Sequence, residues 1–435
     1  MRLIRLLKND IAREAQDWVN SGAITEAQAE QICSRYAVDY HQVNNSSFGY
    51  RTLVGLGYLF IGLSVITLLG ANWDDIPRAL RMACLVVLTL GTQAYAIKTY
   101  IVDKGSSATG IFLLGNMFYG ASIILIAQTY HLGEHMPDGV FWWALGCLPF
   151  GVILNNAILT LQALILGLTW FIMETQAGFY PTTFPLFIGA SLLVLYRGKT
   201  SFMLFLTAMA SLAIWFEYSL SELWRDTRRF EFQPELVAVS VAVCLLAYVC
   251  SQWLGQKQSV KAQDYAASLS LWCLRLGLIF MLVMSFVGPW KELLKATWDN
   301  SASMYGFIIA LTLLSLILAG KTKQLKPVSC AVALYVVALL TVIHTDDPVY
   351  AIYFQAASNL LLVALGIWLI ARGIHSGISH YFFLGVGAIL LTALLRYIDL
   401  IGDYVGGAAL FMLFALLLLG AARYWKNYQS TERLT

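Results

Sequence analysis

The fold is decided by runs such as residues 107–128, SATGIFLLGNMFYGASIILIAQ, in which 22 consecutive positions carry no charged side chain. A helix that crosses a bilayer needs about 20 mostly apolar residues, because no water is present to bond its backbone groups. Of the 435 residues, 59% are hydrophobic and 12% are charged, against about 25% charged in an average soluble domain. The chain is therefore expected to be an integral membrane protein.

Further runs of the same kind follow one another along most of the chain. They predict an all-α fold, a polytopic transmembrane helix bundle of about 14 spans. The expected runs are 52–70, 81–98, 107–128, 139–154, 157–174, 182–196, 202–217, 235–254, 266–287, 302–320, 327–344, 349–371, 377–395 and 404–422. The count falls by one or two if the runs on either side of Asn155 and Asn156 form a single re-entrant element. The predicted organisation is a cytoplasmic segment in 1–50, the helix bundle in 51–425 and a cytoplasmic tail in 426–435.

The basic residues predict the orientation of the chain. If the runs alternate in direction, 19 of the 28 Lys and Arg residues fall on the side of the N-terminus and eight on the other, with Arg275 inside a run. Because cytoplasmic loops are enriched in Lys and Arg, both ends are placed in the cytoplasm. Residues 224–230 carry three arginines on the outer side, where a short interfacial helix is expected.

Residues 1–50 have the spacing of two or three short amphipathic helices. One helical face is expected to carry Ile4, Leu7, Ile11, Ala15 and Trp18. Gly22 breaks this helix, and a second begins after Thr25. Two interpretations stay open. The first helix could lie on an anionic membrane surface, or the segment could be a small solvated helical hairpin.

Polar residues gather in the loops that are predicted to lie on the outer side. Charge is costly inside a bilayer, so its placement is the main functional clue. The candidates for a ligand or ion pathway are Asn72, Asp74, Asp75, Arg78, Gln128, His131, Glu174, Arg275, Arg396, Asp399 and Asp403. In one interpretation the arginines bind an anionic or polar ligand, and the carboxylates bind cations or protons. In the other, Arg and Asp pair to close helix ends and fix the loops.

Arg275 differs from the other candidates because it lies between Leu274 and Leu276, well inside an apolar run. A cation in that position is expected to face the bundle interior or a watery cavity, and to pair with a carboxylate or with carbonyls. The alternative is that the helix begins later and the side chain extends to the interface.

One short motif suggests metal chemistry, but its context does not. The segment His131-Leu-Gly-Glu134-His135 matches the H-x-x-E-H pattern of a zinc peptidase class. Gly133 interrupts the motif, Pro137 follows closely, and no downstream third ligand is evident. Six of the seven cysteines lie in apolar runs, without C-x-x-C spacing. We therefore predict no metal site, no cofactor and no identifiable catalytic residue, and the net charge of +3 does not indicate a nucleic-acid partner.

Several stretches resemble a known bacterial family, the predicted membrane proteins grouped as domain of unknown function 2157. The likeness rests on Trp18, Gly22-Ala23-Ile24 and Tyr36, on Gly55-Leu56-Gly57, on Ala71-Asn72-Trp73-Asp74, on Gly115 and Gly120, on Ala127-Gln128-Thr129-Tyr130-His131, on Trp143-Ala144-Leu145-Gly146, and on Arg396-Tyr397-Ile398-Asp399 with Gly402-Asp403. It is best over residues 1–150 and again near the C-terminus. The resemblance implies a multi-pass membrane protein of a bacterium, which we expect in the inner (cytoplasmic) membrane, and it adds no established activity.

Three functions are compatible with these features. The leading one is a transporter, exporter or flippase-like carrier of a small polar or lipid-linked substrate, since polytopic chains without a soluble catalytic domain are often carriers. The second is an integral membrane enzyme that acts on an envelope or lipid-linked substrate, with a carboxylate or His131 as base. The third is a non-catalytic sensor or assembly factor, in which residues 1–50 bind a cytoplasmic partner.

Overall fold

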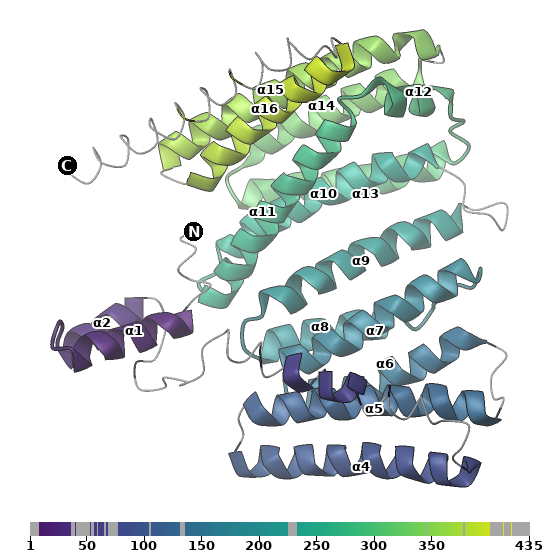
Figure 1. The fold of residues 1–435 in the computed structure, drawn as a ribbon. Helices are drawn as coiled ribbons and strands as arrows, with labels where there is room; N and C mark the ends of the chain where they lie inside the picture. Colours follow the sequence, from purple (N-terminus) through teal and green to yellow (C-terminus); the bar gives the residue numbers. More distant parts are fainter. Residues whose placement is uncertain are drawn as a thin grey trace. The chain divides into compact units, whose positions relative to one another are not determined.

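The computed structural model describes residues 8–35, 40, 53, 56–58, 60–64, 67, 77–103, 106–130, 135–224, 233–345, 347–376, 379–400, 412 and 419. Helices and their connections make up these residues, and no strand occurs among them (Figure 1). The predicted all-α class is therefore confirmed. The chain forms two compact units, Arg2–Phe230 and Glu231–Thr435, which are described separately below.

The N-terminal part of the first unit is a helical hairpin. Helices α1 (Lys8–Asn20) and α2 (Glu26–Arg35) are joined through Gly22, whose φ of 73° confirms the predicted break. Thr25 begins α2 with a capping box, because its backbone N–H donates to Gln28 Oε1 at 2.9 Å and its hydroxyl accepts from the Gln28 N–H.

The two helices bury a small core of their own. It consists of Ala12, Ala15, Ala29, Cys33 and Tyr40, with Val19 and Ile24 packed against it. Trp18, which was expected on the apolar face, is 41% exposed. Burial raises the pKa of the Cys33 thiol, so this side chain stays protonated and packs as a small apolar group. Ala12, Ala15 and Val19 of α1 thus pack inside the hairpin, whereas Ile4, Leu7 and the side chain of Ile11 lie outside the described residues. Whether the hairpin is solvated or lies on a membrane stays a prediction.

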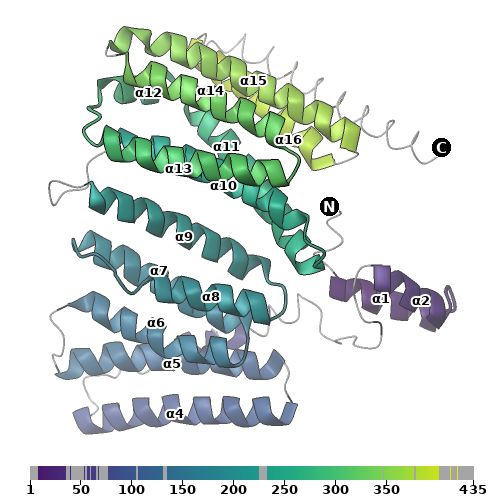
Figure 2. The same cartoon turned by 180° about the vertical axis from the view of Figure 1, so that it is seen from behind.

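Six further helices of the first unit follow the helical residues 53, 56–58, 60–64 and 67. They are α4 (Arg78–Asp103), α5 (Ser106–Tyr130), α6 (Met136–Ile153), α7 (Ala157–Gln176), α8 (Pro185–Arg197) and α9 (Phe202–Leu223). Helices that follow one another lie side by side, as Figures 1 and 2 show from opposite directions. Proline stands in the first turn of α6 and of α8, where its missing N–H costs no helical hydrogen bond.

The segment around Asn155 and Asn156 is a tight turn between two separate helices. Asn155 has a φ of 47°, and the Asn156 side chain accepts hydrogen bonds from the N–H groups of Ile158 and Leu159. Asn156 therefore caps α7. Helices α6 and α7 have 18 and 20 residues, so each is long enough to cross a bilayer. Their lengths favour two spans here over a single re-entrant element.

The second unit contains the remaining described helices. They are α10 (Pro234–Gly255), α11 (Val260–Val283), α12 (Val287–Lys295), α13 (Ser301–Lys321), α14 (Leu325–Ile343), the 3₁₀ turn η2 (Pro348–Tyr350), α15 (Ala351–Ser376) and α16 (Ser379–Leu400). Helix α10 packs on α11 and on α13, and α15 packs on α16.

Ten helices in the described residues are long and apolar enough to cross a membrane. Between 11% and 44% of each such segment is buried inside the protein, so much of the remaining apolar surface needs lipid to cover it. Twelve of the fourteen predicted runs coincide with helices, although α8, with 13 residues, is short for a span. In the run 52–70, residues 53, 56–58, 60–64 and 67 are described, and all of them are helical. The run 404–422, apart from residues 412 and 419, lies outside the described residues, as do 225–230 of the expected interfacial helix. The count of about 14 and the orientation remain predictions.

Helix α12 was not predicted. It has nine residues, too few to produce a long apolar run, and it buries Leu293 and Leu294 against Met284, Val342 and Ala351. The indole Nε1 of Trp290 donates to the carbonyl oxygen of Met284 at 2.7 Å, and its ring stacks on Phe354. These contacts hold α12 across the end of α11, with exposed Lys295 and Glu292 on its other side.

Helices α15 and α16 approach each other closely enough for their backbones to touch. A Cβ placed on Gly385 would lie 2.5 Å from the carbonyl oxygen of Gly366 and 3.0 Å from the backbone nitrogen of Ile370. A Cβ on Gly387 would meet nothing within 4 Å. Small residues at a helix contact allow this approach in membrane proteins.

Gly385→Ala is expected to lower the stability of the protein, because the new methyl group meets the backbone of α15, which cannot rotate away. The cost is about 1–3 kcal/mol. Gly387→Ala is the matched control, and it should be neutral or slightly stabilising, since alanine favours a helix. Thermal unfolding of the detergent-solubilised protein measures both. Equal midpoints for the two variants would contradict the close contact.

Candidate functional site

A chain of hydrogen-bonded amides lies between three helices of the first unit. The Gln93 Nε2 on α4 donates to Asn116 Oδ1 on α5 at 2.9 Å, and Asn116 Nδ2 donates to Gln162 Oε1 on α7 at 2.8 Å. Asn116 is only 1% exposed. We call Gln93, Asn116 and Gln162 the amide chain.

The amide chain is reinforced from neighbouring residues. Trp143 on α6 donates its indole N–H to the backbone carbonyl of Asn116 at 2.8 Å, so a fourth helix is attached to the same point. The hydroxyls of Thr89 and Ser122 lie 3.0 Å apart, about one turn further along α4 and α5. Polar contacts of this kind hold helices together where lipid supplies no alternative partner, at about 0.6–2 kcal/mol each.

Glycines provide the space for these side chains. A Cβ on Gly115 would lie 2.9 Å from Cδ and Nε2 of Gln93, and a Cβ on Gly120 would overlap the Trp143 ring. The space beside Gly115 is occupied by the amide of Gln93, and the space beside Gly120 by the indole that donates to Asn116.

The amide chain contains no charged group and leaves one buried acceptor unused. Gln93 Oε1 is buried and has no hydrogen-bond partner. A buried acceptor without a partner carries a desolvation cost of about 1–3 kcal/mol, unless a donor reaches it. Gln93 lies near the middle of α4, and Asn116 near the middle of α5. The arrangement can bind a neutral group that donates a hydrogen bond, halfway along the helices.

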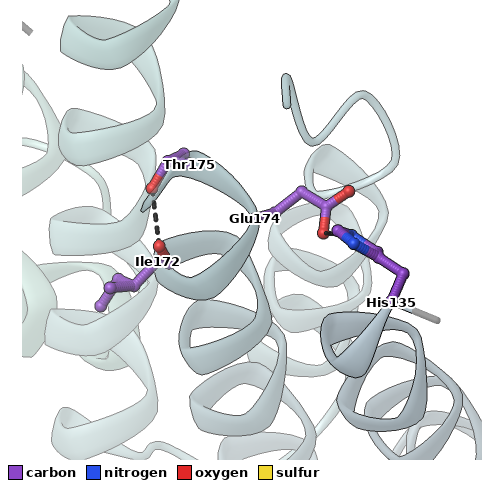
Figure 3. A network of polar contacts seen from close by, with 4 residues as sticks. All are labelled: His135, Ile172, Glu174 and Thr175. Carbon is purple, nitrogen blue, oxygen red and sulfur yellow. Dashed lines mark hydrogen bonds and ion pairs between the residues drawn. The ribbon is translucent and has the colours of Figure 1, made fainter. Parts of the chain in front are cut away.

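A second polar contact lies at one end of the first unit. His135 Nε2 is 2.8 Å from Glu174 Oε2, which joins the start of α6 to the end of α7 (Figure 3). The side chains are 31% and 14% exposed. The Phe179 ring meets the His135 ring edge-on, with centroids 5.1 Å apart. Next to Glu174, the Thr175 hydroxyl donates to the carbonyl oxygen of Ile172 and so faces its own helix (Figure 3).

Aromatic side chains extend this end of the unit toward α9. The hydroxyls of Tyr180 and Ser219 lie 2.7 Å apart, and the Tyr180 ring is stacked on Tyr218 with centroids 6.1 Å apart. Tyr218 also meets Phe171 edge-on. These contacts fix the connection between α7 and α8 against the end of α9.

The structure describes only part of the predicted site. Asn72, Asp74, Asp75, His131 and Asp403 lie outside the described residues, as does the side chain of Asp399. Arg78 and Gln128 are exposed at the start of α4 and near the end of α5. Glu174 contacts His135, which was not among the candidates. In the part of the chain that the structure describes, no group of three His, Cys, Asp or Glu side chains could hold a metal ion.

Arg275 is half-buried on α11. Its guanidinium lies 5.2 Å from the centre of the Trp272 ring, and Trp272 is 41% exposed. A guanidinium over an indole face is a favourable cation–π contact. The residue is thus accompanied by an exposed aromatic side chain one turn earlier on the same helix.

Arg396 lies at one end of the second unit. Its guanidinium is over the Phe286 ring at 5.1 Å, beside the connection from α11 to α12. The carbonyl oxygen of Ser285 accepts hydrogen bonds from Gln355 Nε2 and Asn359 Nδ2 on α15. At the same end of the helices, the buried Glu235 accepts from the backbone N–H of Asn300 and so caps α13. Glu235 thus has a structural role at the start of α13, whereas the role of Arg396 stays a prediction.

Sequence reasoning missed the amide chain. It ranked residues by charge, and Gln93, Asn116 and Gln162 are neutral. The available signal was their position, because each lies inside a run that is otherwise apolar, where a polar group needs a partner.

Gly115→Ala is expected to break the Gln93–Asn116 hydrogen bond and leave the helices in place, because the new methyl group displaces only the flexible end of Gln93. A loss of about 1 kcal/mol in unfolding free energy is expected. Gly91→Ala on α4 is the control, since nothing lies within 4 Å of its Cβ. The cost of Gly115→Ala should largely vanish in a Gln93→Met background. An unchanged cost there would contradict the assignment. Unfolding of the solubilised protein measures each variant.

Comparison with known sequences agrees with the resemblance drawn from the residues. A sequence model of a family described as predicted membrane protein (DUF2157) matches residues 16–160. The matched stretch includes Gln93 and Asn116 and ends just before Gln162. Neither a curated protein nor a solved structure matches the chain. The similarity to the family of predicted membrane proteins (DUF2157) thus covers residues 16–160, about a third of the chain.

Proposed function

We propose that this protein is a membrane carrier for a small polar or lipid-linked substrate, and that the amide chain forms part of the substrate's route. The observation that supports it is the buried, unpaired Gln93 Oε1 next to Asn116, halfway along apolar helices. Transporters commonly bind substrate near the bilayer midplane, where irregular or polar groups are otherwise avoided.

The chemistry of the amide chain favours an uncharged donor. Its three side chains donate in one direction, from Gln93 through Asn116 to Gln162. A hydroxyl, amine or amide N–H of a substrate would donate to Gln93 Oε1, so that this acceptor of the amide chain also has a hydrogen-bond donor. A carboxylate or phosphate would instead meet an acceptor, and no basic group belongs to the chain.

The competing explanation of the amide chain is that it only holds the helices together. Neutral amides hold membrane helices together without binding anything, and glycines beside them serve the same purpose. That explanation accounts for the two amide–amide hydrogen bonds, but it leaves Gln93 Oε1 without a donor. The carrier proposal gives this acceptor a partner.

A second candidate is an integral membrane enzyme, and the contact between His135 and Glu174 favours it. A histidine held by a carboxylate can act as a general base. Both side chains are partly accessible at one end of the first unit. This pair takes the role that sequence reasoning gave to His131.

The two candidates are separated by metabolite and lipid profiles of cells that lack the protein, compared with cells that carry the wild type, Asn116→Leu or His135→Ala. For a carrier, the deletion and Asn116→Leu should accumulate the same solute or lipid-linked intermediate on one side of the membrane. Thr99→Val is the control for Asn116→Leu, since the Thr99 hydroxyl bonds only its own helix, and it should match the wild type.

A missing covalent modification in the deletion and in His135→Ala, with a normal profile for Asn116→Leu, would favour the enzyme. If the deletion changes neither profile, both candidates fail and a sensor or assembly factor becomes the better explanation. The N-terminal hairpin would then be the part that contacts a cytoplasmic partner.

The orientation belongs to the same proposal. We infer an even number of spans in the inner membrane of a bacterium, with both ends in the cytoplasm. The distribution of basic residues supports it. The α10–α11 connection then faces the cytoplasm, and the connection from α12 to α13 faces outward.

Ser259→Cys and Thr297→Cys test this orientation, because both residues are exposed and lie at opposite ends of α11. In a cysteine-free chain in intact cells, a thiol reagent that cannot cross the membrane should label position 297 and leave position 259 unlabelled. The reverse pattern would invert the orientation, and labelling of both positions would rule out a span between them.

A further inference from the structure

We propose that four lysines at one end of the second unit bind the phosphate headgroup of an anionic phospholipid. Lys257 follows α10, and Lys321, Lys323 and Lys326 surround the turn between α13 and α14. All four are exposed. We call them the lysine cluster. This site would be present whether or not the protein is a carrier.

Hydrogen bonds bring the two parts of the lysine cluster together. Gln324, within the α13–α14 turn, donates from Nε2 to Gln252 Oε1 on α10 at 3.3 Å. Gln252 Nε2 in turn lies 3.2 Å from Ser270 Oγ on α11. Because Gln252 lies about one turn before the end of α10, the turn that carries three lysines is held beside Lys257. The cluster is a feature of the folded unit and not of one loop.

An aromatic ring supports one lysine of the cluster. The Lys257 Nζ lies 4.3 Å from the centre of the Trp253 ring. Its backbone carbonyl accepts from Gln263 Nε2 at 3.1 Å. Tryptophan is common at the headgroup level of membranes, where its amphipathic ring is stable. The contact keeps a positive charge at that level.

The backbone at Lys323 also points to a role for its side chain. Lys323 has a φ of 57°, in the left-handed region where glycine is favoured at the end of a helix. The neighbouring Thr322 is buried, and the Gln324 N–H closes the turn on the carbonyl oxygen of Ala319. A glycine would fit this turn with less strain. If Lys323 only added to the general excess of basic residues on one side of the membrane, a lysine at an unstrained position nearby would serve equally well. Its presence at a strained position indicates that its side chain has a role there.

The surface beside the cluster suits the rest of a phospholipid. Trp253, Val260 and Leu325 are 36%, 42% and 48% exposed, and each is next to the cluster in the chain. Exposed apolar side chains beside a group of cations suit a ligand that has both acyl chains and a phosphate. A soluble anion would use the lysines alone. This apolar neighbourhood is why we assign the site to a lipid.

The opposite end of the second unit has a different charge pattern. Lys291 and Lys295 are accompanied there by Glu292, Asp299 and Asp347. Near the lysine cluster, Asp264 on α11 is 1% exposed and so does not lie on the surface. The positive charge is therefore concentrated at the cluster end, where it can attract an anionic headgroup.

The test uses the full chain in a neutral detergent. Native mass spectrometry measures bound lipid, and thermal unfolding measures stabilisation, after addition of dioleoylphosphatidylglycerol or dioleoylphosphatidylcholine. Glycerol 3-phosphate, a soluble anion with the same phosphate, is the third addition. The variants are Lys323→Gly alone and the triple change Lys321→Gln, Lys323→Gly, Lys326→Gln. The double change Lys291→Gln, Lys295→Gln is the control.

The wild type and the control should bind phosphatidylglycerol in preference to phosphatidylcholine and unfold at a higher temperature with it. Lys323→Gly should weaken binding about fivefold, and the triple change about a hundredfold, in line with an attraction of about 1 kcal/mol for each lysine to an anionic lipid surface. Because glycine suits the left-handed turn, Lys323→Gly should fold normally, so a loss of binding cannot be a loss of structure. Raising the ionic strength should weaken the preference.

Three results would overturn the proposal. The first is unchanged phosphatidylglycerol binding in the triple variant. The second is an equal loss in the control, which would indicate attraction by net charge without a site. The third is equally strong stabilisation by glycerol 3-phosphate, which would assign the cluster to a soluble anion.

Discussion

No water reaches the hydrocarbon core of a bilayer, so the backbone N–H and C=O groups of a spanning segment must bond one another. Only the helix meets that requirement within a single segment, and the described elements follow it. Helix ends are the exceptions, because their last groups have no partner inside the helix. The Asn156 side chain accepts a hydrogen bond from an N–H group in the first turn of α7, and Glu235 accepts one from the N–H of Asn300 at the start of α13. The side chains of Gln355 and Asn359 bond a free carbonyl after α11.

The same constraint acts on side chains and explains how glycines and amides occur together. A polar side chain in an apolar helix needs a partner on another helix, and the two helices must approach closely for the amides to meet. Gly115 gives that space to Gln93, and Gly120 gives it to Trp143, which bonds the backbone of Asn116. The glycine and the polar side chain beside it depend on each other. The effect on stability of changing one therefore depends on whether the other is present.

Charged side chains in the described units gather toward helix ends, and they differ between the ends. At one end of the second unit, Glu235 caps the start of α13, Arg396 lies over the Phe286 ring, and charges of both signs surround α12. The other has the lysine cluster, with Trp253 below Lys257. Substrate, if carried, would meet neutral amides inside the first unit, whereas lipid would meet cations at the surface of the second. Solute binding and lipid binding would thus use separate chemistry.

The sequence by itself determined the all-helical membrane class, most helix positions and the break at Gly22, because apolar length and glycine act locally. Tertiary structure decided which polar groups meet. Gln93, Asn116 and Gln162 are distant in the chain, and only the packing of α4, α5 and α7 joins them. It also decided that α12 packs on α14, α15 and the end of α11, and that Ala12 and Ala15 of α1 pack against α2. Hydropathy shows that a segment avoids water. Any apolar neighbour, whether lipid or another helix, removes the segment from water equally well. The choice of the neighbouring helix therefore comes from shape and hydrogen bonds.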